Sequence, residues 1–381
     1  MNESKLNIGF KGDTVLLSMV VFLVGVGCLV VYSSVSARAV SSSVLTSTEE
    51  LFFQHLIMIG LGLIAMFACY KIDYKWFGLF SLPLMILSLL LMVLVSIPGI
   101  GIEVNAAKRW LLVPGVNRSF QPSDLAKLSV IIHLAATLSK LQKDTGDFVK
   151  LLLRSLVLPI VLIVLIALND ISTALLLTLV VGIVMFIARV QTKVFLSFLG
   201  VVILCSPVVY FLSSRVQTAI SRILDYFSMS GVGSTEFPHQ VEQANIALAL
   251  GGLNGVGLGH SQQRYFLPEA FSDYIYAIVV EEHGFKMGVV LLLIYIGILF
   301  RGMKITRKTT TPFSGLLVLG MCMLVVLQAV THMAVVTGLG PVTGLPLPWI
   351  SMGGASLFFT GVEFGIILSV SRSIYLAGER K

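Results

Sequence analysis

Ten apolar stretches, separated by short polar connections, follow one another along this chain of 381 residues. The hydrocarbon layer of a membrane is about 30 Å thick, so an α-helix needs about 20 mostly apolar residues to cross it. Only 12% of the residues are charged, whereas about 25% is usual in a soluble domain. The sequence therefore predicts an all-α polytopic membrane protein with about ten transmembrane helices, forming a single integral-membrane domain over residues 1–381.

Two of the span assignments need an argument. A single helix from Ser155 to Ala188 would be about 51 Å long, and Asn169 and Asp170 interrupt its middle, so this stretch is predicted to be a hairpin. The first span lacks a small-residue cleavage site and is expected to be retained. The predicted spans are Val15–Val35, His55–Cys69, Leu79–Val95, Pro122–Leu138, Leu151–Leu168, Thr173–Ala188, Phe195–Leu212, Tyr274–Phe300, Pro312–Val336 and Gly354–Val370.

The distribution of basic residues predicts the orientation. With a cytoplasmic N-terminus, most of the 26 Lys and Arg residues lie on the cytoplasmic side, as the positive-inside rule requires. Both termini are then cytoplasmic, and the long loop 213–272, between the seventh and eighth helices, is extracytoplasmic. The net charge of +7 is explained by topology and by anionic lipid, so no nucleic acid partner is expected.

Charged residues that border the membrane gather on the predicted outer side. Lys108, Arg109 and Trp110 lie in the loop after the third span, and Asp124 and Lys127 stand three residues apart at the start of the fourth. Residues at this spacing share a helix face and can form an ion pair. A capped helix with one ion pair is the simpler interpretation of the last two residues, and a polar cavity is the other.

The long outer loop ends in a glycine-rich run, Gly251–Gly259, and then reaches Asp273 at the threshold of the eighth helix. A carboxylate at this position can cap the helix, which is the structural alternative to a catalytic role. Glu281 and Glu282 follow two turns later inside an apolar helix. Because charged groups inside a membrane are unfavourable unless they are paired or wet, the two glutamates indicate a polar cavity.

The turn before the last helix, Thr337 to Ser356, contains three prolines and repeated glycines. Irregular backbone at membrane depth is tolerated only where protein or a wet cavity covers it. This segment is therefore predicted to be re-entrant or to line a cavity.

Three ordered blocks of the sequence stand out. They are Ala107–Trp110 with Gln121–Lys127, Gly251–Glu282, and Gly344–Ser351 with Gly353 and Gly354. These blocks resemble the SEDS family (shape, elongation, division and sporulation), to which FtsW, RodA and SpoVE belong. Within the second block, Leu267-Pro268-Glu269-Ala270 is more similar to the division members. Departures from the family pattern are Asp124 for Glu, Asn169-Asp170-Ile171-Ser172 for Pro-Asp-Leu-Gly, Ser272 for Thr and His332 for Asn.

The resemblance implies a peptidoglycan glycosyltransferase that polymerises lipid II, with a class B penicillin-binding protein as its transpeptidase partner and other divisome or elongasome membrane proteins around it. It places the protein in the bacterial cytoplasmic (inner) membrane with the active site on the outer face. In this interpretation Asp273 is the general base, because the attacking hydroxyl must lose a proton.

The other site residues are assigned around this base. Lys108 and Arg109 are expected to hold the diphosphate, and Trp110, Glu281 and Glu282 to contribute to substrate binding. An ordinary aromatic residue at the membrane interface is the alternative for Trp110, and a contribution of Glu281 or Glu282 to binding a divalent ion is left open. A structural network is assigned to Asp124, Lys127 and Asp170. No cofactor is required with certainty, and a divalent cation such as Mg or Mn is left open. The four cysteines lack the spacing of a metal site.

Two other functions fit a ten-helix membrane body. A transporter that flips lipid II would share the broken segments and intramembrane charges, although its site should be reachable from both sides. A non-catalytic division scaffold explains the membrane body and leaves the residues around Asp273 without a role.

Overall fold

The structure is a computed structural model. It describes residues 10–41, 47–97, 99–104, 107–113, 118–141, 155–213, 216–218, 220–221, 224, 236–267 and 269–379.

Each of the ten predicted spans coincides with a helix of the described chain. They are α1 (Thr14–Ser41), α2 (Thr48–Lys71), α4 (Ser81–Ser96), α5 (Pro122–Leu141), α7 (Val157–Asn169), α8 (Ile171–Ile187), α9 (Thr192–Leu212), α12 (Ile275–Arg307), α13 (Pro312–Val336) and α14 (Ala355–Glu379). Six of the ten are long and apolar enough to cross a membrane, and α4, α7 and α8 are shorter apolar helices. The all-α polytopic class is confirmed.

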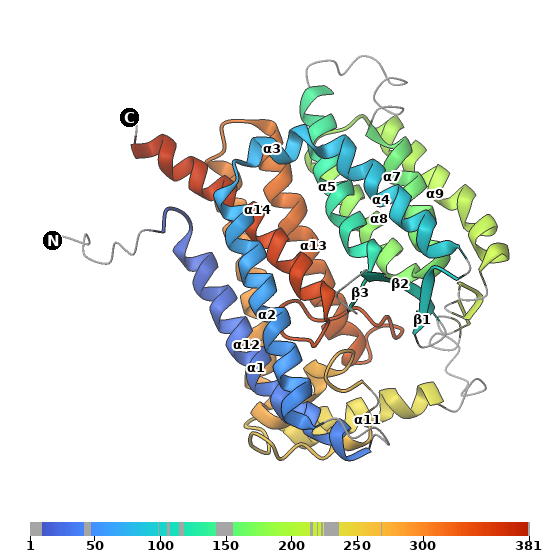
Figure 1. The fold of residues 1–381 in the computed structure, drawn as a ribbon, viewed down its shortest axis with the longest axis vertical. Coiled ribbons are helices and arrows are strands. Elements are labelled where there is room, and N and C mark those ends of the chain that lie inside the picture. Colours follow the sequence, from blue (N-terminus) through green and yellow to red (C-terminus); the bar gives the residue numbers. More distant parts are fainter. Residues whose placement is uncertain are drawn as a thin grey trace.

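The helices form one bundle in which α13 is central (Figure 1). It packs against α5, α8, α12 and α14, and α2 runs along α14. The two chain ends lie at one end of the bundle, where Lys11 and Glu379 form an ion pair of 2.8 Å. We call this the terminal end. The described ends of the chain therefore lie at the same end of the bundle, and the cytoplasmic position of both termini stays a prediction.

Close contact between α2 and α14 depends on small residues. A Cβ atom added to Gly361 would lie 2.0 Å from the carbonyl oxygen of Gly62, so a side chain at this position would push the helices apart. Packing through small residues is a common way for membrane helices to approach each other.

The chain breaks at Asp170, as the hairpin interpretation expected. Asp170 ends α7 with extended backbone angles and caps α8 by accepting a hydrogen bond from the Thr173 amide. The helices on its two sides pack against each other, and α9 returns to the break, where the Ser213 hydroxyl donates to the carbonyl of Leu168.

The opposite end of the bundle, which we call the loop end, carries a small antiparallel sheet that the sequence analysis did not anticipate. Its strands are β1 (Gly101–Val104), β2 (Ala107–Val113) and β3 (Arg118–Phe120), with β2 in the middle. The apolar spans on either side gave the strongest signal in this part of the sequence. The outer strands β1 and β3 have only four and three residues, which is too short for a clear alternation of apolar and polar residues.

The loop end also holds the described part of the loop 213–272. This part contains α11 (Glu236–Gly251), which packs against α12, and a 3₁₀ turn over Gln263–Tyr265. In Figure 1, α11 lies across the lower end of the bundle.

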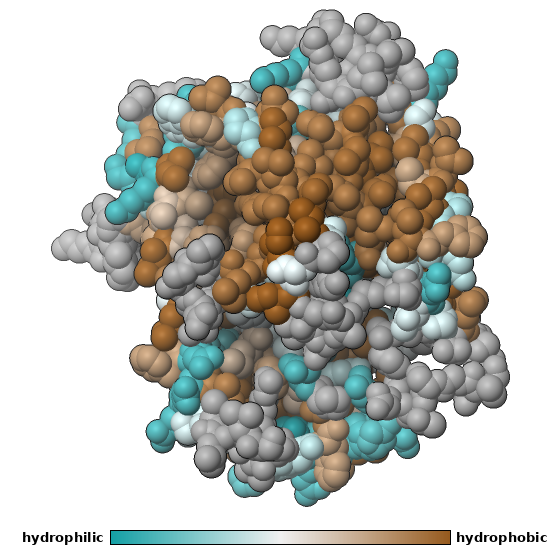
Figure 2. Space-filling view, turned by 45° about the vertical axis from the view of Figure 1, so that its right-hand side comes forward, coloured by the Kyte–Doolittle hydropathy of each residue, from teal (hydrophilic) through white to brown (hydrophobic). Residues whose placement is uncertain are grey.

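A broad apolar surface lies between more hydrophilic ends (Figure 2). Exposed side chains of α4 and α9 contribute to such a surface, among them Leu82, Leu90, Leu204 and Phe211. An apolar surface of this extent suits the hydrocarbon of a membrane.

Candidate active site

Asp273 lies at the loop end, just before α12, on a turn fixed by Glu269. The backbone of Glu269 is left-handed, with φ 57°, which is uncommon for a residue with a side chain. Its carbonyl accepts hydrogen bonds of 3.0 Å from the amides of Ser272 and Asp273. The N-cap of α12 is Tyr274, so the geometry does not favour the alternative in which Asp273 caps this helix.

The surroundings of Asp273 favour its protonated form. Burial, and then the nearby Glu269 carboxylate, raise the pKa of Asp273 from its ordinary value to about 6, whereas the Ser272 hydroxyl and Arg109 oppose the shift. A carboxyl with a pKa near neutrality is suited to accept and release a proton at physiological pH.

The irregular segment between α13 and α14 covers Asp273. Gly344 and Trp349 both have left-handed backbone angles, with φ 66° and 65°. A Cβ atom added to Gly344 would lie 3.5 Å from Oδ2 of Asp273, so the segment passes directly beside the carboxylate. The prediction that irregular backbone at this depth would line a site agrees with this geometry.

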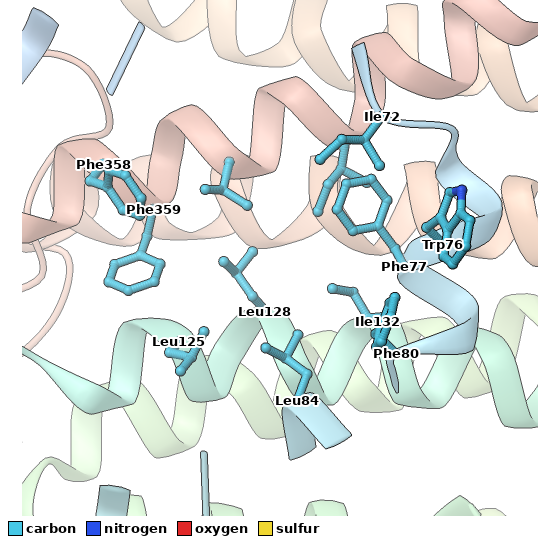
Figure 3. A pocket seen from close by; sticks show the side chains of 12 residues that line it. Ile72, Trp76, Phe77, Phe80, Leu84, Leu125, Leu128, Ile132, Phe358 and Phe359 are labelled. Carbon is cyan, nitrogen blue, oxygen red and sulfur yellow. The ribbon is translucent and has the colours of Figure 1, made fainter. Parts of the chain in front are cut away.

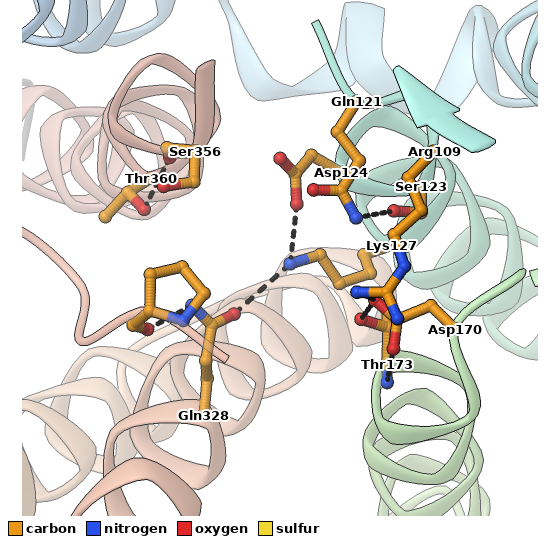
Figure 4. A network of polar contacts seen from close by, with 11 residues as sticks. Arg109, Gln121, Ser123, Asp124, Lys127, Asp170, Thr173, Gln328, Ser356 and Thr360 are labelled. Carbon is orange, nitrogen blue, oxygen red and sulfur yellow. Dashed lines mark hydrogen bonds and ion pairs between the residues drawn. The ribbon is translucent and has the colours of Figure 1, made fainter. Parts of the chain in front are cut away.

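A buried ion pair lies at the start of α5. Asp124 and Lys127 are 2.9 Å apart and both side chains are more than nine-tenths buried. The ammonium of Lys127 also donates to Oε1 of Gln328 on α13, at 3.2 Å (Figure 4). The i,i+3 spacing predicted this pair, whereas nothing in the sequence indicated that Gln328 would join it.

Glu363 was missed by the sequence analysis. It lies in the middle of α14, is only 5% exposed, and interacts electrostatically with Lys127 and Asp124. One ammonium group therefore faces two carboxyl groups. The signal was available, because a glutamate inside an apolar span requires a polar partner.

Arg109 connects the sheet to the helix hairpin. Its guanidinium group donates to the carbonyl of Asn169 at 3.0 Å and forms an ion pair of 3.1 Å with Asp170. Trp110 lies next to it on β2, opposite Ile102, and is partly exposed. The backbone of Lys108 is part of β2, and its side chain lies outside the described residues.

Glu281 and Glu282 are buried beneath the loop. The Glu281 carboxylate accepts hydrogen bonds from the Ser261 hydroxyl and from the amides of Gln262 and Gln263. The Glu282 carboxylate accepts from the Ser33 hydroxyl of α1 and from the Gly259 amide. These contacts fasten the loop to α12 and join α12 to α1, and the predicted binding role of both glutamates stays a prediction.

Glycine backbone makes this docking of the loop possible. Gly284 interrupts α12 with φ 81° and ψ 170°. Cβ atoms added to Gly251, Gly255 and Gly284 would each lie within 2.3 Å of a carbonyl oxygen on the facing segment. The glycine-rich run therefore serves close backbone contact.

An apolar groove of about 590 Å³ lies between side chains of α5 and α14 (Figure 3). Leu125 and Leu128 on α5 line it, and they follow Asp124 and Lys127 directly in the sequence. The remaining lining residues are Ile72, Trp76, Phe77, Phe80, Leu84, Ile132, Phe358, Phe359, Val362 and Ile366.

A metal site needs several side-chain ligands that converge on one point. No group of three or more His, Cys, Asp or Glu side chains in the described part is arranged to hold a metal ion. Glu269 and Asp273 alone would supply fewer ligands than Mg²⁺ or Mn²⁺ needs.

Comparison with known proteins shows the family to which this chain belongs. The sequence profile described as "Cell cycle protein", for FtsW, RodA and SpoVE, matches residues 14–375. The chain belongs to this family. This FtsW/RodA/SpoVE protein is 36% identical to a probable peptidoglycan glycosyltransferase FtsW of Geobacter metallireducens, over 94% of each chain. It is 33% identical to the stage V sporulation protein E of Bacillus subtilis, over 94% of this chain and 97% of that one.

Solved structures show the same fold for this FtsW/RodA/SpoVE protein. A chain of a peptidoglycan synthase complex that coordinates polymerization and crosslinking superposes with a TM-score of 0.72, at 25% identity, over 96% of this chain and 98% of that one. The rod shape determining protein RodA of Thermus thermophilus superposes with a TM-score of 0.66, at 23% identity and the same coverage. The family resemblance drawn from the sequence is confirmed.

Proposed function

We propose that this protein is a peptidoglycan glycosyltransferase that polymerises lipid II, with Asp273 as the general base. The observation that carries the proposal is the half-buried carboxyl of Asp273, placed where the loop, the irregular segment and the Arg109 side of the sheet meet. The relatives named as probable peptidoglycan glycosyltransferases support the reaction class.

In the proposed reaction, the 4-hydroxyl of one lipid-linked sugar attacks the anomeric carbon of another. The new C–O bond forms as the bond to the polyprenyl diphosphate breaks, with inversion. The hydroxyl proton passes to Asp273, and the leaving diphosphate takes the bonding electrons. A raised pKa suits a base that must be ionised before the step and protonated after it.

The leaving diphosphate needs cations around it. Lys108 and Arg109 are the proposed ones, and Arg109 is already oriented by Asp170. Trp110 is proposed to contact the sugar or the interface. We propose that Glu281 and Glu282 contribute to binding through the shape of the loop they fasten. A divalent cation would take most of its ligands from the substrate, and no step here is derived through one.

The apolar groove is proposed to receive the polyprenyl chain. Its lining is aliphatic and aromatic, and two of the lining residues, Leu125 and Leu128, follow Asp124 and Lys127 in the sequence. A chain lying in the groove would keep its diphosphate near the loop end, which is the proposed outer face of the bacterial cytoplasmic membrane. A transpeptidase of the penicillin-binding type is the proposed partner, because a structural relative belongs to a complex that also crosslinks.

The deciding experiment compares wild type with Asp273→Asn. Purified protein, with and without a class B penicillin-binding protein, is given lipid II, and glycan strands are separated on a gel. Loss of the base should lower the rate roughly 10²–10⁴-fold. Glu49→Gln changes an exposed carboxylate in the first turn of α2 and is the matched control.

A flippase would give a different result in the same variant. Asn preserves the size of the Asp273 side chain, so translocation of lipid II across vesicle membranes should continue in Asp273→Asn if translocation is a separate activity. Polymerisation within a few-fold of wild type would refute the proposed mechanism. A loss of translocation together with intact polymerisation would favour the transporter alternative.

A further inference from the structure

The irregular segment beside Asp273 is held by buried side chains of two helices. Within residues 345–348, three main-chain carbonyls each accept a hydrogen bond from a buried side chain. The donors are His332 to Leu345 at 2.7 Å, Gln328 to Pro346 at 2.8 Å and Tyr295 to Pro348 at 2.6 Å. All three donors are at most 5% exposed. These three bonds satisfy buried carbonyls of a segment that has no regular secondary structure and hold it in place.

One hydroxyl connects this segment to the turn that carries Asp273. Ser351 is 1% exposed, and its Oγ accepts a hydrogen bond of 2.8 Å from the amide of Leu347. The same hydroxyl donates at 2.8 Å to the carbonyl of Ser272, the residue before Asp273. The amide of Met352 adds a hydrogen bond of 2.9 Å to the carbonyl of Phe271. The position of Asp273 therefore follows the position of the segment.

Lys127 determines the orientation of the side-chain amide of Gln328. An ammonium group has donors only, so the atom of Gln328 that faces it must be the acceptor Oε1, at 3.2 Å. The donor Nε2 is then directed to the carbonyl of Pro346. Because Lys127 is held by the Asp124 carboxylate at 2.9 Å, the amide has one favourable orientation.

We propose that Gln328 and Ser351 are positioning residues for Asp273. Together they form a buried path from the Asp124–Lys127 ion pair through Pro346, Leu347 and Ser272 to the base. The inference rests on the proposed function for its kinetic test. Without the Nε2 donor, the buried carbonyl of Pro346 loses its partner and the segment can move. A displacement of about 1 Å at a reacting group can lower a rate about 100-fold.

The kinetic test uses Gln328→Met, Ser351→Ala and the double variant. Each single change should lower kcat by about 10- to 100-fold and leave the KM for lipid II within about threefold, because the substrate contacts are elsewhere. Since both changes interrupt one path, the double variant should be little slower than the slower single variant. Thr337→Val is the control, since the described hydrogen bonds of the Thr337 hydroxyl go to the carbonyls of Met333 and Ala334 on α13.

Two kinetic results would overturn the inference. Single variants within twofold of wild type would show that the path does not affect the base. Losses that multiply in the double variant would show two independent effects. Should Gln328→Met give no folded protein, Gln328→Glu keeps the size and an acceptor for Lys127 and replaces the donor to Pro346 by a carboxylate oxygen, so the same loss of kcat is expected.

A second measurement separates this inference from the proposed function. Hydrogen exchange at the amides of Leu347 and Met352 should be faster in Gln328→Met and Ser351→Ala than in wild type, and unchanged in Thr337→Val. If the wild type makes no glycan, the proposed function fails, and this measurement still decides the path. If both amides exchange at the same rate in wild type and in all variants, the positioning role of Gln328 and Ser351 is wrong.

Discussion

Helices α13 and α9 are almost equally apolar, yet they occupy opposite environments. In the most apolar window of each, 78% of the residues of α13 are buried inside the protein, compared with 17% in α9. The polar side chains differ too. Gln328 and His332 of α13 bond to another segment, whereas Ser197 and Ser206 of α9 bond to carbonyls of their own helix.

This difference shows that hydropathy identifies a span but not its neighbours. A polar side chain with a long reach is favourable in a membrane helix only where the protein offers a partner. A serine that bonds within its own turn needs none. Long polar side chains such as Gln and His therefore indicate a helix that packs against other protein segments, whereas serines alone are compatible with a helix that faces lipid.

The largest effect on stability is expected from the ion pair beside α13. Lys127→Met leaves the Asp124 carboxylate buried without its partner, and breaking such a pair costs about 3–5 kcal/mol of the free energy of unfolding. The exposed Lys193 at the start of α9 gives the matched change, Lys193→Met, with little expected effect. Thermal unfolding in detergent measures both, and equal losses would remove the distinction between the two regions.

Truncation of one leucine in each helix tests whether α13 is buried in protein and α9 faces lipid. Leu317→Ala in α13 removes a fully buried side chain and should lower the free energy of unfolding by about 2–5 kcal/mol. Leu204→Ala in α9, where Leu204 is 76% exposed, should change it far less, because lipid fills the space. A large loss from Leu204→Ala would mean that another protein, rather than lipid, covers α9.

The pH dependence of polymerisation should change when a neighbour of Asp273 is replaced and stay the same when a residue of α9 is replaced. Asp273 has a pKa of about 6 and acts only when ionised, so the rate should fall about tenfold for each pH unit below that value. Glu269→Gln removes a neighbouring negative charge and should move this limb to lower pH. The rates of wild type, Glu269→Gln and Leu204→Ala at a series of pH values measure this shift. If the fall in rate at low pH occurs at the same pH in Glu269→Gln as in wild type, Asp273 is not the titrating group.

The smallest effect is expected at Arg109, which joins the sheet to the hairpin of α7 and α8. Arg109→Lys keeps the charge opposite Asp170 and loses the planar group that also reaches the carbonyl of Asn169. About 1 kcal/mol of the free energy of unfolding should be lost. Thermal unfolding detects this change, and Arg264→Lys, at a loop position away from the hairpin, is a useful comparison.

Much of the fold could be predicted from the sequence, because each span satisfies its own backbone hydrogen bonds and so has a local signal. The ten apolar stretches, the break at Asp170 and the Asp124–Lys127 pair are all local features. The sheet between α4 and α5 was not predicted, because its short strands are stabilised by pairing across turns.

The site was predictable only in part, for a related reason. Asp273 and the irregular segment before α14 carry a local signal in their residue types. The contacts that join them do not, since Lys127 and Gln328 are 201 positions apart and Ser351 and Ser272 are 79 apart. A side-chain amide that bonds a proline carbonyl leaves no pattern in a single sequence.

The contact between Ser33 and Glu282 also has a consequence for how the protein is made. The two residues are 249 positions apart, and at roughly 5–20 residues per second the ribosome needs roughly 12–50 s to go from one to the other. Throughout that time α1 is in the membrane without its partner helix α12. The contact of Gly62 with Gly361 forms later still. The newly made chain is therefore open to the insertion machinery and to quality-control proteases until its last helix arrives.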